Sequence, residues 1–429
     1  DALYEKILER YEGDYEHDRK GLVRDVMSHI WASRRGLSEA ELLELLGAKD
    51  KPMPRAYWSP LYLAAEESLV SRSGLLNFFH DYLRKAVEDK YLRDKGQKRL
   101  AHLQLADYFE KKPLDARKMD ELPWLLRQAE ERNRLRACLL DIDQFLLIQK
   151  REQNELMGYW VWLREEREMG KGYLESFESW SEKPGNHASY AANQLAIFLL
   201  DAALHADAEP LMRRALRISE TCLGAEHPNV ATCLNNLVLL LKDINRLAEA
   251  EPLMRRALKI DEQSFGENHP NVAIRLHNLA GLRHATNRLA EAEPLVRRAL
   301  KIDEQSFGEN HPNVARGLNS LAVLLQATNR LPEAEPLMRR ALKIDEQSFG
   351  ENHPKVARDI GDLAQLLHDN NRLAEAEPLM RRALKIDEQS FGENHPNVAR
   401  DLSNLAQLLH DTNRLAEAEP LMRRALKID

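Results

Sequence analysis

The sequence predicts a mostly all-α protein: a superhelix of stacked helix pairs with a 42-residue repeat, preceded by a smaller helical domain. The string Glu-Pro-Leu-Met-Arg-Arg-Ala-Leu begins at Glu209 and returns at 42-residue intervals, once with Val in place of Met. Apolar residues within each unit follow the spacing of one helix face. All six tryptophans precede residue 187, so the N-terminal part has a different character. Self-similarity at a fixed period is the signature of a solenoid.

Size, composition and charge restrict the class of protein. A chain of 429 residues is too long for one compact core, and 31 % charged with 43 % hydrophobic residues is typical of a soluble globular protein. No apolar run is long enough to cross a bilayer and no secretory leader is visible, which predicts a cytoplasmic protein without membrane contact. The net charge of −7 argues against nucleic acid as a general partner. Three scattered cysteines predict neither a disulfide framework nor a metal site.

Each repeat unit contains two helical patterns joined by short turns. In one unit we expect a first helix over 229–244 and a second over 247–264. Gly266 lies where a left-handed C-terminal cap belongs, and Pro270 lies near the start of the next helix. Pro252 falls near the start of the second helix, where its missing N–H should bend the helix without breaking it.

The large and small apolar positions carry a family resemblance. A large, large, small, large, small, small order runs through Leu234, Leu237, Val238, Leu241, Ala250 and Ala257. This order resembles the tetratricopeptide signature, and the 42-residue period resembles the repeats of kinesin light chains. The resemblance covers residues 187–429 in about six repeats, of which the first, near 189–224, is degenerate. It implies a superhelix whose concave groove binds a protein or peptide.

Differences between the otherwise copied units concentrate at six positions of the first helix. Unit by unit, these positions hold Thr232, Ile274, Arg316, Arg358, Arg400; Cys233, Arg275, Gly317, Asp359, Asp401; Asn235, His277, Asn319, Gly361, Ser403; Asn236, Asn278, Ser320, Asp362, Asn404; Leu239, Gly281, Val323, Gln365, Gln407; and Lys242, His284, Gln326, His368, His410. Most share one helix face, which points away from the second helix. Because random drift would scatter over all exposed positions, the clustering favours a tuned binding surface. The alternative is that exposed first-helix positions drift more freely than crowded second-helix positions.

The polar character of this face predicts which residues bind the ligand. A ladder of Arg316, Arg358 and Arg400 suits carboxylates, and asparagine can hydrogen-bond a peptide backbone. Asn278 followed by Arg316 partly resembles the carboxylate clamp of chaperone-binding tetratricopeptide domains. The candidate ligand-binding residues are Asn235, Asn236, Asn278, His284, Arg316, Asn319, Arg358, Asp362, His368, Arg400, Asn404 and His410.

Two other recurrent features are interpreted as structural. One histidine per unit cannot form a tetrahedral metal site with its neighbours, so we expect a capping or loop-packing role. These histidines are His227, His269, His311, His353 and His395. The repeated Arg-Arg pair, for example Arg255-Arg256, lies among glutamates and predicts a solvated outer face with salt bridges.

Residues 1–95 predict a winged-helix domain with a leading helix, and residues 96–186 a helical bridge rich in Leu and Trp. The expected domain elements are helices over 21–35, from Ser38, and between 54 and 67, followed by strands on either side of Ser73-Gly74.

DNA binding through this domain is disfavoured. Its third helix is apolar, is interrupted by Pro60 and offers only Arg55 to phosphates.

A short motif after the hairpin carries a second resemblance. Phe79-His80-Asp81, which opens a helix over 82–91, resembles the Met-His-Asp motif in winged-helix domains of STAND-class nucleotide switches. Segments 31–38 and 122–126 also resemble relatives of nephrocystin-3 and similar NACHT-type ATPases. The resemblance implies that His80 contacts the ADP β-phosphate in the closed state. The alternative is a packed histidine after a strand.

The chain contains no P-loop of the form GxxxxGK followed by Ser or Thr. We therefore expect a nucleotide-binding domain, with ATP or ADP and Mg, to precede Asp1, and no cofactor in the present region. A start without Met and an end within a helical pattern fit a piece of a longer protein. The bridge would then carry ligand occupancy from the array to the switch.

These patterns leave three functions to compare. The leading one is the ligand-sensing, protein-binding region of a STAND NTPase that oligomerises on activation, by analogy in bacterial immunity against phage. The second is a passive scaffold or cargo adaptor of the kinesin light chain type. An enzyme is disfavoured because the sequence has no paired carboxylates in a plausible cleft, no Ser or Cys nucleophile pattern and no metal cluster.

Overall fold

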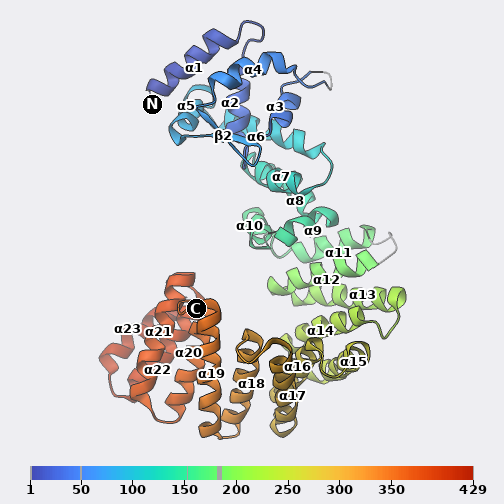
Figure 1. Ribbon diagram of the computed structural model, residues 1–429, viewed down its shortest axis with the longest axis vertical. Helices are drawn as coiled ribbons and strands as arrows, with labels where there is room; N and C mark the ends of the chain where they lie inside the picture. Colours follow the sequence, from blue (N-terminus) through green and yellow to red (C-terminus); the bar gives the residue numbers. More distant parts are fainter. Residues whose placement is uncertain (1, 49–50, 152, 181–185, 429) are drawn as a thin grey trace. The chain divides into compact units, whose positions relative to one another are not determined.

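The computed structural model describes residues 2–48, 51–151, 153–180 and 186–428, which are helical almost throughout (Figure 1). The chain divides into two compact units, Asp1–Leu211 and Met212–Asp429. The predicted boundary at residue 186 adjoins 181–185, which lie outside the described residues. None of the described helices combines the length and apolar character that spanning a bilayer requires.

The first unit begins with a helical module that carries a β-hairpin. Its elements are α1 (Ala2–Tyr15), α2 (Leu22–Ala32), α3 (Glu39–Leu45), α4 (Arg55–Ala64), β1 (Leu69–Arg72), β2 (Leu75–Phe78) and α5 (Asp81–Tyr91). The three predicted helices and the hairpin are therefore present in the predicted order. The strands are antiparallel, with Leu69 opposite Phe78, and Leu37 adds an isolated bridge to Leu76.

Local chemistry explains where these elements begin and turn. Ser38 Oγ accepts the N–H of Glu41 at 3.2 Å while the Glu41 carboxylate accepts the N–H of Ser38 at 2.7 Å, a reciprocal cap that starts α3. Ser73 and Gly74 both have positive φ, 52° and 79°, as a tight two-residue hairpin turn requires. The expected interruption at Pro60 is wrong: α4 continues through it, because one proline removes only one helical hydrogen bond.

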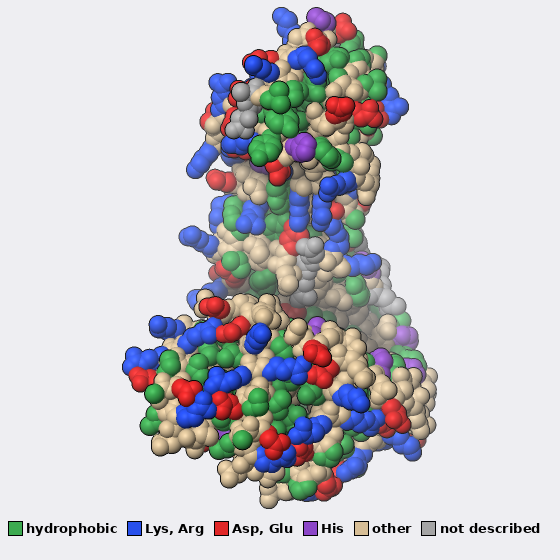
Figure 2. Space-filling model, turned by 60° about the vertical axis from the view of Figure 1, so that its left-hand side comes forward, with side chains coloured by type: hydrophobic (Ala, Val, Ile, Leu, Met, Phe, Trp, Pro, Cys, Tyr) green, Lys and Arg blue, Asp and Glu red, His purple; other side chains and the backbone are tan. Residues whose placement is uncertain are grey.

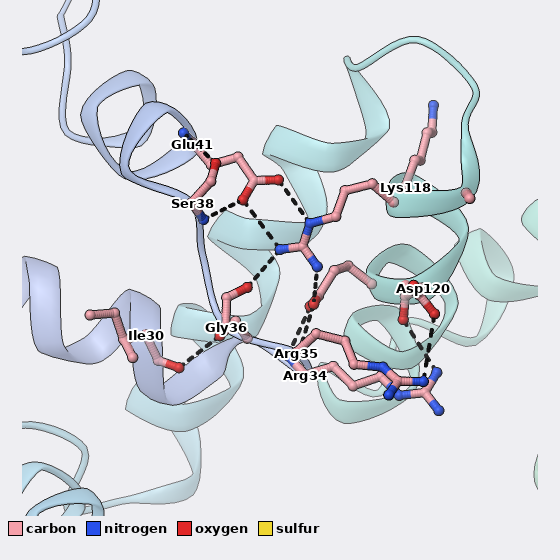
Figure 3. Close-up of polar contacts among 12 residues, drawn as sticks. Ile30, Arg34, Arg35, Gly36, Ser38, Glu41, Lys118 and Asp120 are labelled. Atoms are coloured by element: carbon pink, nitrogen blue, oxygen red, sulfur yellow. Dashed lines mark hydrogen bonds and ion pairs between the residues drawn. The ribbon is translucent and has the colours of Figure 1, made fainter. Parts of the chain in front are cut away.

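Segment 31–38 lies against the residue that precedes segment 122–126, because the buried carboxylate of Glu121 contacts Arg34 and Arg35. Figure 3 shows these two arginines beside Asp120. The Glu121 carboxylate accepts the backbone N–H groups of Arg34 at 2.8 Å and Arg35 at 2.9 Å, and the guanidinium of Arg117 at 2.7 Å. Burial raises the pKa of Glu121 although these three donors favour the charged form. The carboxylate therefore fixes the loop after α2 against α7 (Ala116–Gln128).

The remainder of the first unit is helical, as predicted for the bridge. Its other helices are α6 (Lys95–Glu110), α8 (Arg132–Leu140), α9 (Ile142–Arg151), α10 (Gln153–Leu163), α11 (Met169–Trp180) and α12 (Asn186–Asp201). Aromatic side chains form much of their core. Trp160 Nε1 donates to Tyr173 Oη at 3.1 Å, and Phe145 packs edge-on against Tyr173 with ring centroids 5.1 Å apart.

The second unit consists of regular helix pairs. Helix α13 (His205–Leu223) contains the division between the units, and the pairs that follow are α14 (Pro228–Asp243) with α15 (Leu247–Phe265), α16 (Pro270–Ala285) with α17 (Leu289–Phe307), α18 (Pro312–Ala327) with α19 (Leu331–Phe349), α20 (Pro354–Asp369) with α21 (Leu373–Phe391), and α22 (Pro396–Asp411) with α23 (Leu415–Ile428). The signature residues Leu234, Ala250 and Ala257 are fully buried. Small residues at these positions let the paired helices approach closely.

The turn that joins one repeat to the next confirms one prediction and corrects another. His269 caps α16 by accepting the Asn271 N–H on Nδ1 at 3.1 Å, and its ring stacks on Phe265 at 4.6 Å between centroids. Gly266 has φ 86° but ψ 158°, so it is not the predicted left-handed helical cap. The chain must extend there to reach the next helix, and only glycine adopts that conformation readily. The residue with left-handed φ is Asn245 (59°), between α14 and α15.

The prediction for Pro252 is confirmed in that the helix is not broken. The proline lies inside α15, which continues to Phe265. One missing N–H near a helix start removes at most one hydrogen bond, so the helix tolerates it.

Salt bridges join successive second helices on the outer face, as the repeated Arg-Arg pair predicted. Arg298 contacts Glu262 of the preceding second helix at 2.8 Å, and the same pair returns one unit later as Arg340 and Glu304 at 3.0 Å. Over the second unit, Figure 2 shows basic and acidic side chains interspersed. Such pairs are partly exposed to solvent and individually weak, so they fix the alignment of successive repeats more than they stabilise the fold.

Candidate functional site

The second unit contains a hollow of about 410 Å³ formed mainly by three first helices, α16, α18 and α20. Lys242 of α14 and Val296 of α17 complete its wall. The other lining residues are His277, Ala280, Gly281, His284, Ala285, Arg316, Asn319, Ser320, Val323, Leu324, Arg358 and Asp362. We call it the Gly281 hollow. Most of its lining residues occupy the positions that vary between repeats.

Five of the predicted ligand-binding residues line the hollow: His284, Arg316, Asn319, Arg358 and Asp362. They come from three successive repeats, so helix stacking brings together residues 42 positions apart in the sequence. The two arginines and His284 are exposed, whereas the other two side chains are half-buried. Burial raises the pKa of Asp362 and makes its charged form less favourable.

The arginine ladder is not uniform. Arg400 Nη2 lies 2.9 Å from Asp401 and 3.6 Å from Asp387, so its charge is neutralised within the array. Arg358 only reaches Asp359 at 3.9 Å. The Arg316 side chain forms no ion pair and no hydrogen bond with the residues that the structure describes.

Three predicted asparagines form a chain of hydrogen bonds outside the hollow. Asn278 Nδ2 donates to Asn235 Oδ1 at 2.6 Å, and Asn235 Nδ2 donates to Asn236 Oδ1 at 3.3 Å. Asn235 is buried, with 8 % of its surface exposed. Its side chain therefore links α14 and α16 instead of being open to a ligand.

The remaining predicted residues lie towards the C-terminal end of the array. His368 Nε2 lies 2.9 Å from Asp411 of the next repeat, and His410 Nδ1 lies 3.3 Å from the same carboxylate. These contacts lower the pKa of Asp411. Asn404 is half-buried on α22.

Sequence reasoning missed Asp411 and its counterparts. This position also varies between units, and it reads Asp243, Ala285, Ala327, Asp369 and Asp411. A comparison of the repeats could have found this position, because it holds either alanine or aspartate. In the structure, Ala285 lines the Gly281 hollow, whereas Asp369 accepts a hydrogen bond from Gln326 and Asp411 contacts His368.

One of the six varied positions is buried between repeats, not on the open face. It faces an aspartate that every described second helix from α15 to α21 carries. At the first of these interfaces, Arg275 Nε lies 2.8 Å from Asp261, with 7 % and 1 % of the two side chains exposed. At the next, the position is Gly317, and His277 reaches Asp303 at 3.3 Å instead. A Cβ on Gly317 would lie 3.4 Å from the His277 ring, so glycine makes room for that histidine.

At the last two interfaces the same aspartate faces a second carboxyl group. Asp345 faces Asp359 and Asp387 faces Asp401, and all four are at least 96 % buried. Burial and the neighbouring carboxylate raise the pKa of Asp359 to about 7 and that of Asp387 to about 6. Two carboxylates in one buried site cannot both ionise at low cost, so these pairs bind a proton at higher pH than an isolated aspartate does.

His80 lies at the other end of the chain, in the first unit. It precedes α5 as its N-cap residue, it is exposed, and its ring packs edge-on against Phe79 at 4.4 Å. The alternative of a packed histidine is thus not what the structure has. Contact with a nucleotide remains a prediction.

No group of three or more His, Cys, Asp or Glu within the described ranges is arranged to hold a metal ion.

Comparisons with known families identify two stretches of the chain. Residues 102–275 match the profile of the nephrocystin-3 TPR domain. Residues 278–347, 313–389 and 360–429 match the profile of the tetratricopeptide repeat. The first match begins well before residue 187, where the repeats were predicted to start.

Curated relatives share these stretches. A TPR repeat-containing protein of Dictyostelium discoideum is 34 % identical over 175 residues, which are 40 % of this chain and 10 % of that protein. Nephrocystin-3 of Mus musculus is 30 % identical over 250 residues, 54 % of this chain and 18 % of that protein. The chain thus spans a small part of the length of these relatives.

Solved structures of two kinds are similar at TM-scores below 0.5. One is a STAND protein with a tetratricopeptide repeat sensor from Pyrococcus horikoshii, with 12 % identity and a TM-score of 0.44 over 98 % of this chain and 65 % of that one. The other is a putative kinesin light chain from Podospora anserina, with 22 % identity and a TM-score of 0.42 over 47 % of this chain and 96 % of that one. The fold assignment does not depend on them. Residues 102–275 are thus similar to the nephrocystin-3 TPR domain, and residues 278–429 consist of tetratricopeptide repeats, a fold that mediates protein–protein interaction.

Proposed function

We propose that the repeat array binds a protein or peptide in the groove formed by the first helices, centred on the Gly281 hollow. Stacked repeats present extended surfaces of this kind to partner proteins. One observation carries the proposal: residues that differ between copied units coincide with the lining of the hollow. Variation at a cavity wall changes what the cavity can hold, whereas variation elsewhere on the surface does not.

We further propose that the chain is the sensor region of a STAND-class NTPase. The helix and hairpin module is then a winged-helix domain, and His80 would contact the β-phosphate of ADP bound to a preceding nucleotide-binding domain. The exposure of His80 at the N-terminus of α5 supports this, because a histidine in that place is free to reach a ligand on another domain. Similarity to nephrocystin-3 over half of the chain supports the same assignment. Oligomerisation, a cytoplasmic location and a role in defence against phage belong to this proposal by analogy.

Site-specific photocrosslinking tests the groove. A benzophenone amino acid at Val323, which lines the hollow, should crosslink to members of a random 12-residue peptide library. The same group at Lys301, an exposed residue of α17 outside the hollow, should crosslink far less. Equal labelling at both positions would contradict binding in the groove.

A passive scaffold is the second candidate, because such an adaptor would use the same groove without a nucleotide switch. The gene sequence upstream of the Asp1 codon separates the two. A strand, P-loop and helix there supports the sensor, and their absence supports the adaptor.

A further inference from the structure

We propose that the Gly281 hollow recognises an anionic peptide segment that places one large apolar side chain in the hollow and acidic groups on Arg316 and Arg358. This inference rests on the proposed function, because it assigns the chemistry of the ligand in the same groove. It commits to a peptide partner whose negative charge is carboxylate.

The hollow exists because one repeat has glycine where the others have larger residues. The position of Gly281 holds Leu239, Val323, Gln365 and Gln407 in the other compared units. A Cβ added to Gly281 would have only Lys242 Nζ within 4 Å, at 3.9 Å, so the space beside this helix is open. In this one repeat the position has no side chain, so a ligand side chain can enter there.

The wall of the hollow is apolar at its base. Ala280, Val296 and Leu324 are buried beneath it, and Ala285 and Val323 are exposed beside it. Removing a Leu, Ile or Phe side chain from water against such a surface is worth about 1.5–3 kcal/mol when burial is complete. A cavity of about 410 Å³ has room for one such side chain together with part of a backbone.

The rim is predominantly cationic. Lys242, Arg316 and Arg358 line the hollow as cations, and the carboxyl group opposing them is Asp362. Burial raises the pKa of Asp362, so its carboxyl group attracts the arginines less strongly than a fully ionised one would. A cleft lined by one sign of charge attracts a ligand of the opposite sign.

The arginines of the rim differ from those elsewhere in the array in being available. On the outer face, Arg297 lies 2.6 Å from Glu293 and Arg339 lies 2.8 Å from Glu335. On the inner face, Arg400 is held by Asp401 at 2.9 Å. Within the described residues, Arg316 has no such carboxylate, and Arg358 has one at 3.9 Å. A guanidinium fork without a partner at a groove suits a carboxylate or phosphate that the ligand brings.

Groups that can bind a peptide backbone lie between the charges and the apolar base. Asn319 donates through Nδ2 to Asp359 at 2.8 Å, which holds the amide in place and leaves its oxygen as an acceptor. Ser320 Oγ donates to Arg316 O at 2.9 Å and can accept another bond. Both side chains line the hollow.

Binding of synthetic peptides to the full chain tests the inference. Three blocked ten-residue peptides are compared by fluorescence anisotropy: one with glutamates on both sides of a central leucine, one with glutamines in their place, and one with phosphoserines. We expect the glutamate peptide to bind at least about tenfold tighter than the glutamine peptide, with weaker binding at higher salt. Tighter binding of the phosphoserine peptide would overturn the assignment to carboxylate, and tighter binding of the glutamate peptide would support it.

Two sets of variants locate the interaction. The double variant R316E/R358E should lower affinity for the glutamate peptide by about tenfold or more. The control K301E/K343E changes net charge equally, with the same 42-residue spacing, on exposed second-helix positions, and should leave affinity unchanged. Arg400 is left intact, because reversing its charge would place a third carboxylate beside Asp387 and Asp401.

The variant Gly281→Leu copies Leu239 into the hollow. It should abolish binding while the melting temperature stays equal or rises, because leucine favours a helix over glycine. Gly361→Ala, which adds a side chain where nothing lies within 4 Å and which does not line the hollow, is its control and should bind normally.

The outcomes separate the two proposals. Equal affinity for glutamate and glutamine peptides, unchanged by R316E/R358E, would overturn the anionic ligand while crosslinks from Val323 still support the groove. Absence of any crosslink from Val323 would overturn the groove itself. Binding that survives Gly281→Leu would overturn the role of the hollow even if the charge preference holds.

Discussion

The interfaces between repeats are of two kinds, although the helices that form them are nearly copies. At the α15–α16 interface the recurrent buried aspartate meets Arg275, whereas at α17–α18 the varied position is Gly317 and Asp303 meets His277 of its own repeat. At α19–α20 and α21–α22 it meets another aspartate, Asp359 or Asp401. The residue at this varied position therefore decides whether the aspartate faces a guanidinium, the histidine of its own repeat or a second carboxyl group.

The difference teaches that variation between repeats has two separate roles. Residues on the open face change the chemistry of the groove, whereas the buried position changes how the joint between repeats depends on pH. The Arg275–Asp261 joint is a buried ion pair, whereas burial and a neighbouring carboxylate raise the pKa of Asp359 to about 7 and that of Asp387 to about 6. The joints of the last repeats should therefore be sensitive to pH.

Converting the first kind of joint into the second should have the largest effect. Arg275→Asp leaves Asp261 facing a carboxyl group, and we expect the array to lose about 3–5 kcal/mol of stability at pH 8, because a buried charge loses its partner. Part of the loss should disappear at pH 5, where one of the two groups is protonated. Urea unfolding followed by circular dichroism at both pH values measures this. Arg297→Ala, which removes an exposed ion pair with Glu293, is the control and should cost about 0–1 kcal/mol.

A similar loss in both variants would show that the buried pair does not determine the strength of the joint.

Replacing one carboxyl group of a pair by an amide, which donates a hydrogen bond at any pH, should have an intermediate effect. The folded pKa of Asp359, about 7, lies above its ordinary value of 3.8, so the stabilising contribution is complete below pH 4 and is lost as the pH rises through 7. Asp359→Asn can donate to Asp345 at any pH. We expect it to be about 1–3 kcal/mol more stable than the unmodified protein at pH 8, and the gap to close towards pH 5.

Thermal unfolding at half-unit steps from pH 5 to 8 follows that gap, with Asp243→Asn, at an exposed carboxylate of α14, as the control. A gap that does not change with pH would contradict a protonated pair at this interface.

The smallest effect concerns Gly317, which leaves room for His277 to contact Asp303. Gly317→Ala brings a Cβ to 3.1 Å from Leu300 Cδ1 and 3.4 Å from the His277 ring, so crowding offsets the gain in helix propensity. Gly361→Ala meets nothing within 4 Å and should gain about 0.5–1 kcal/mol. The two melting temperatures should therefore move apart. If both variants gain equally, the histidine does not need the space.

Much of the fold follows from the sequence because each unit repeats its own signals. The helix pairs, the His269 cap and the outer-face salt bridges come from local patterns that recur five or six times, so chance agreement is excluded. The conformation at Gly266 was wrong because glycine allows several regions of positive φ, and only the path to the next helix selects one. The predicted interruption of α4 at Pro60 was wrong because tertiary packing of Trp58 and Leu61 outweighs one lost hydrogen bond.

The candidate site was only partly predictable, since the sequence gives the varied positions but not what faces them. The 42-residue period places Arg316 and Arg358 at the same position of successive first helices, and the structure brings them to one hollow. The buried joint of Asp345 with Asp359 could not be read from one unit, because its two halves lie on different helices. Asn235 was misread as open to ligand for the same reason: its partner Asn278 belongs to the next repeat.

The spacing of the outer-face pairs bears on how such a gene changes. Arg298 reaches back to Glu262, and the same reach recurs in Arg340 with Glu304 and in Arg382 with Glu346. Each 42-residue cassette thus carries one half of the joint before it and one half of the joint after it. Unequal crossing-over that inserts or deletes a whole cassette rebuilds every outer contact, so the protein can be lengthened, shortened or shuffled in a single genetic event and still fold.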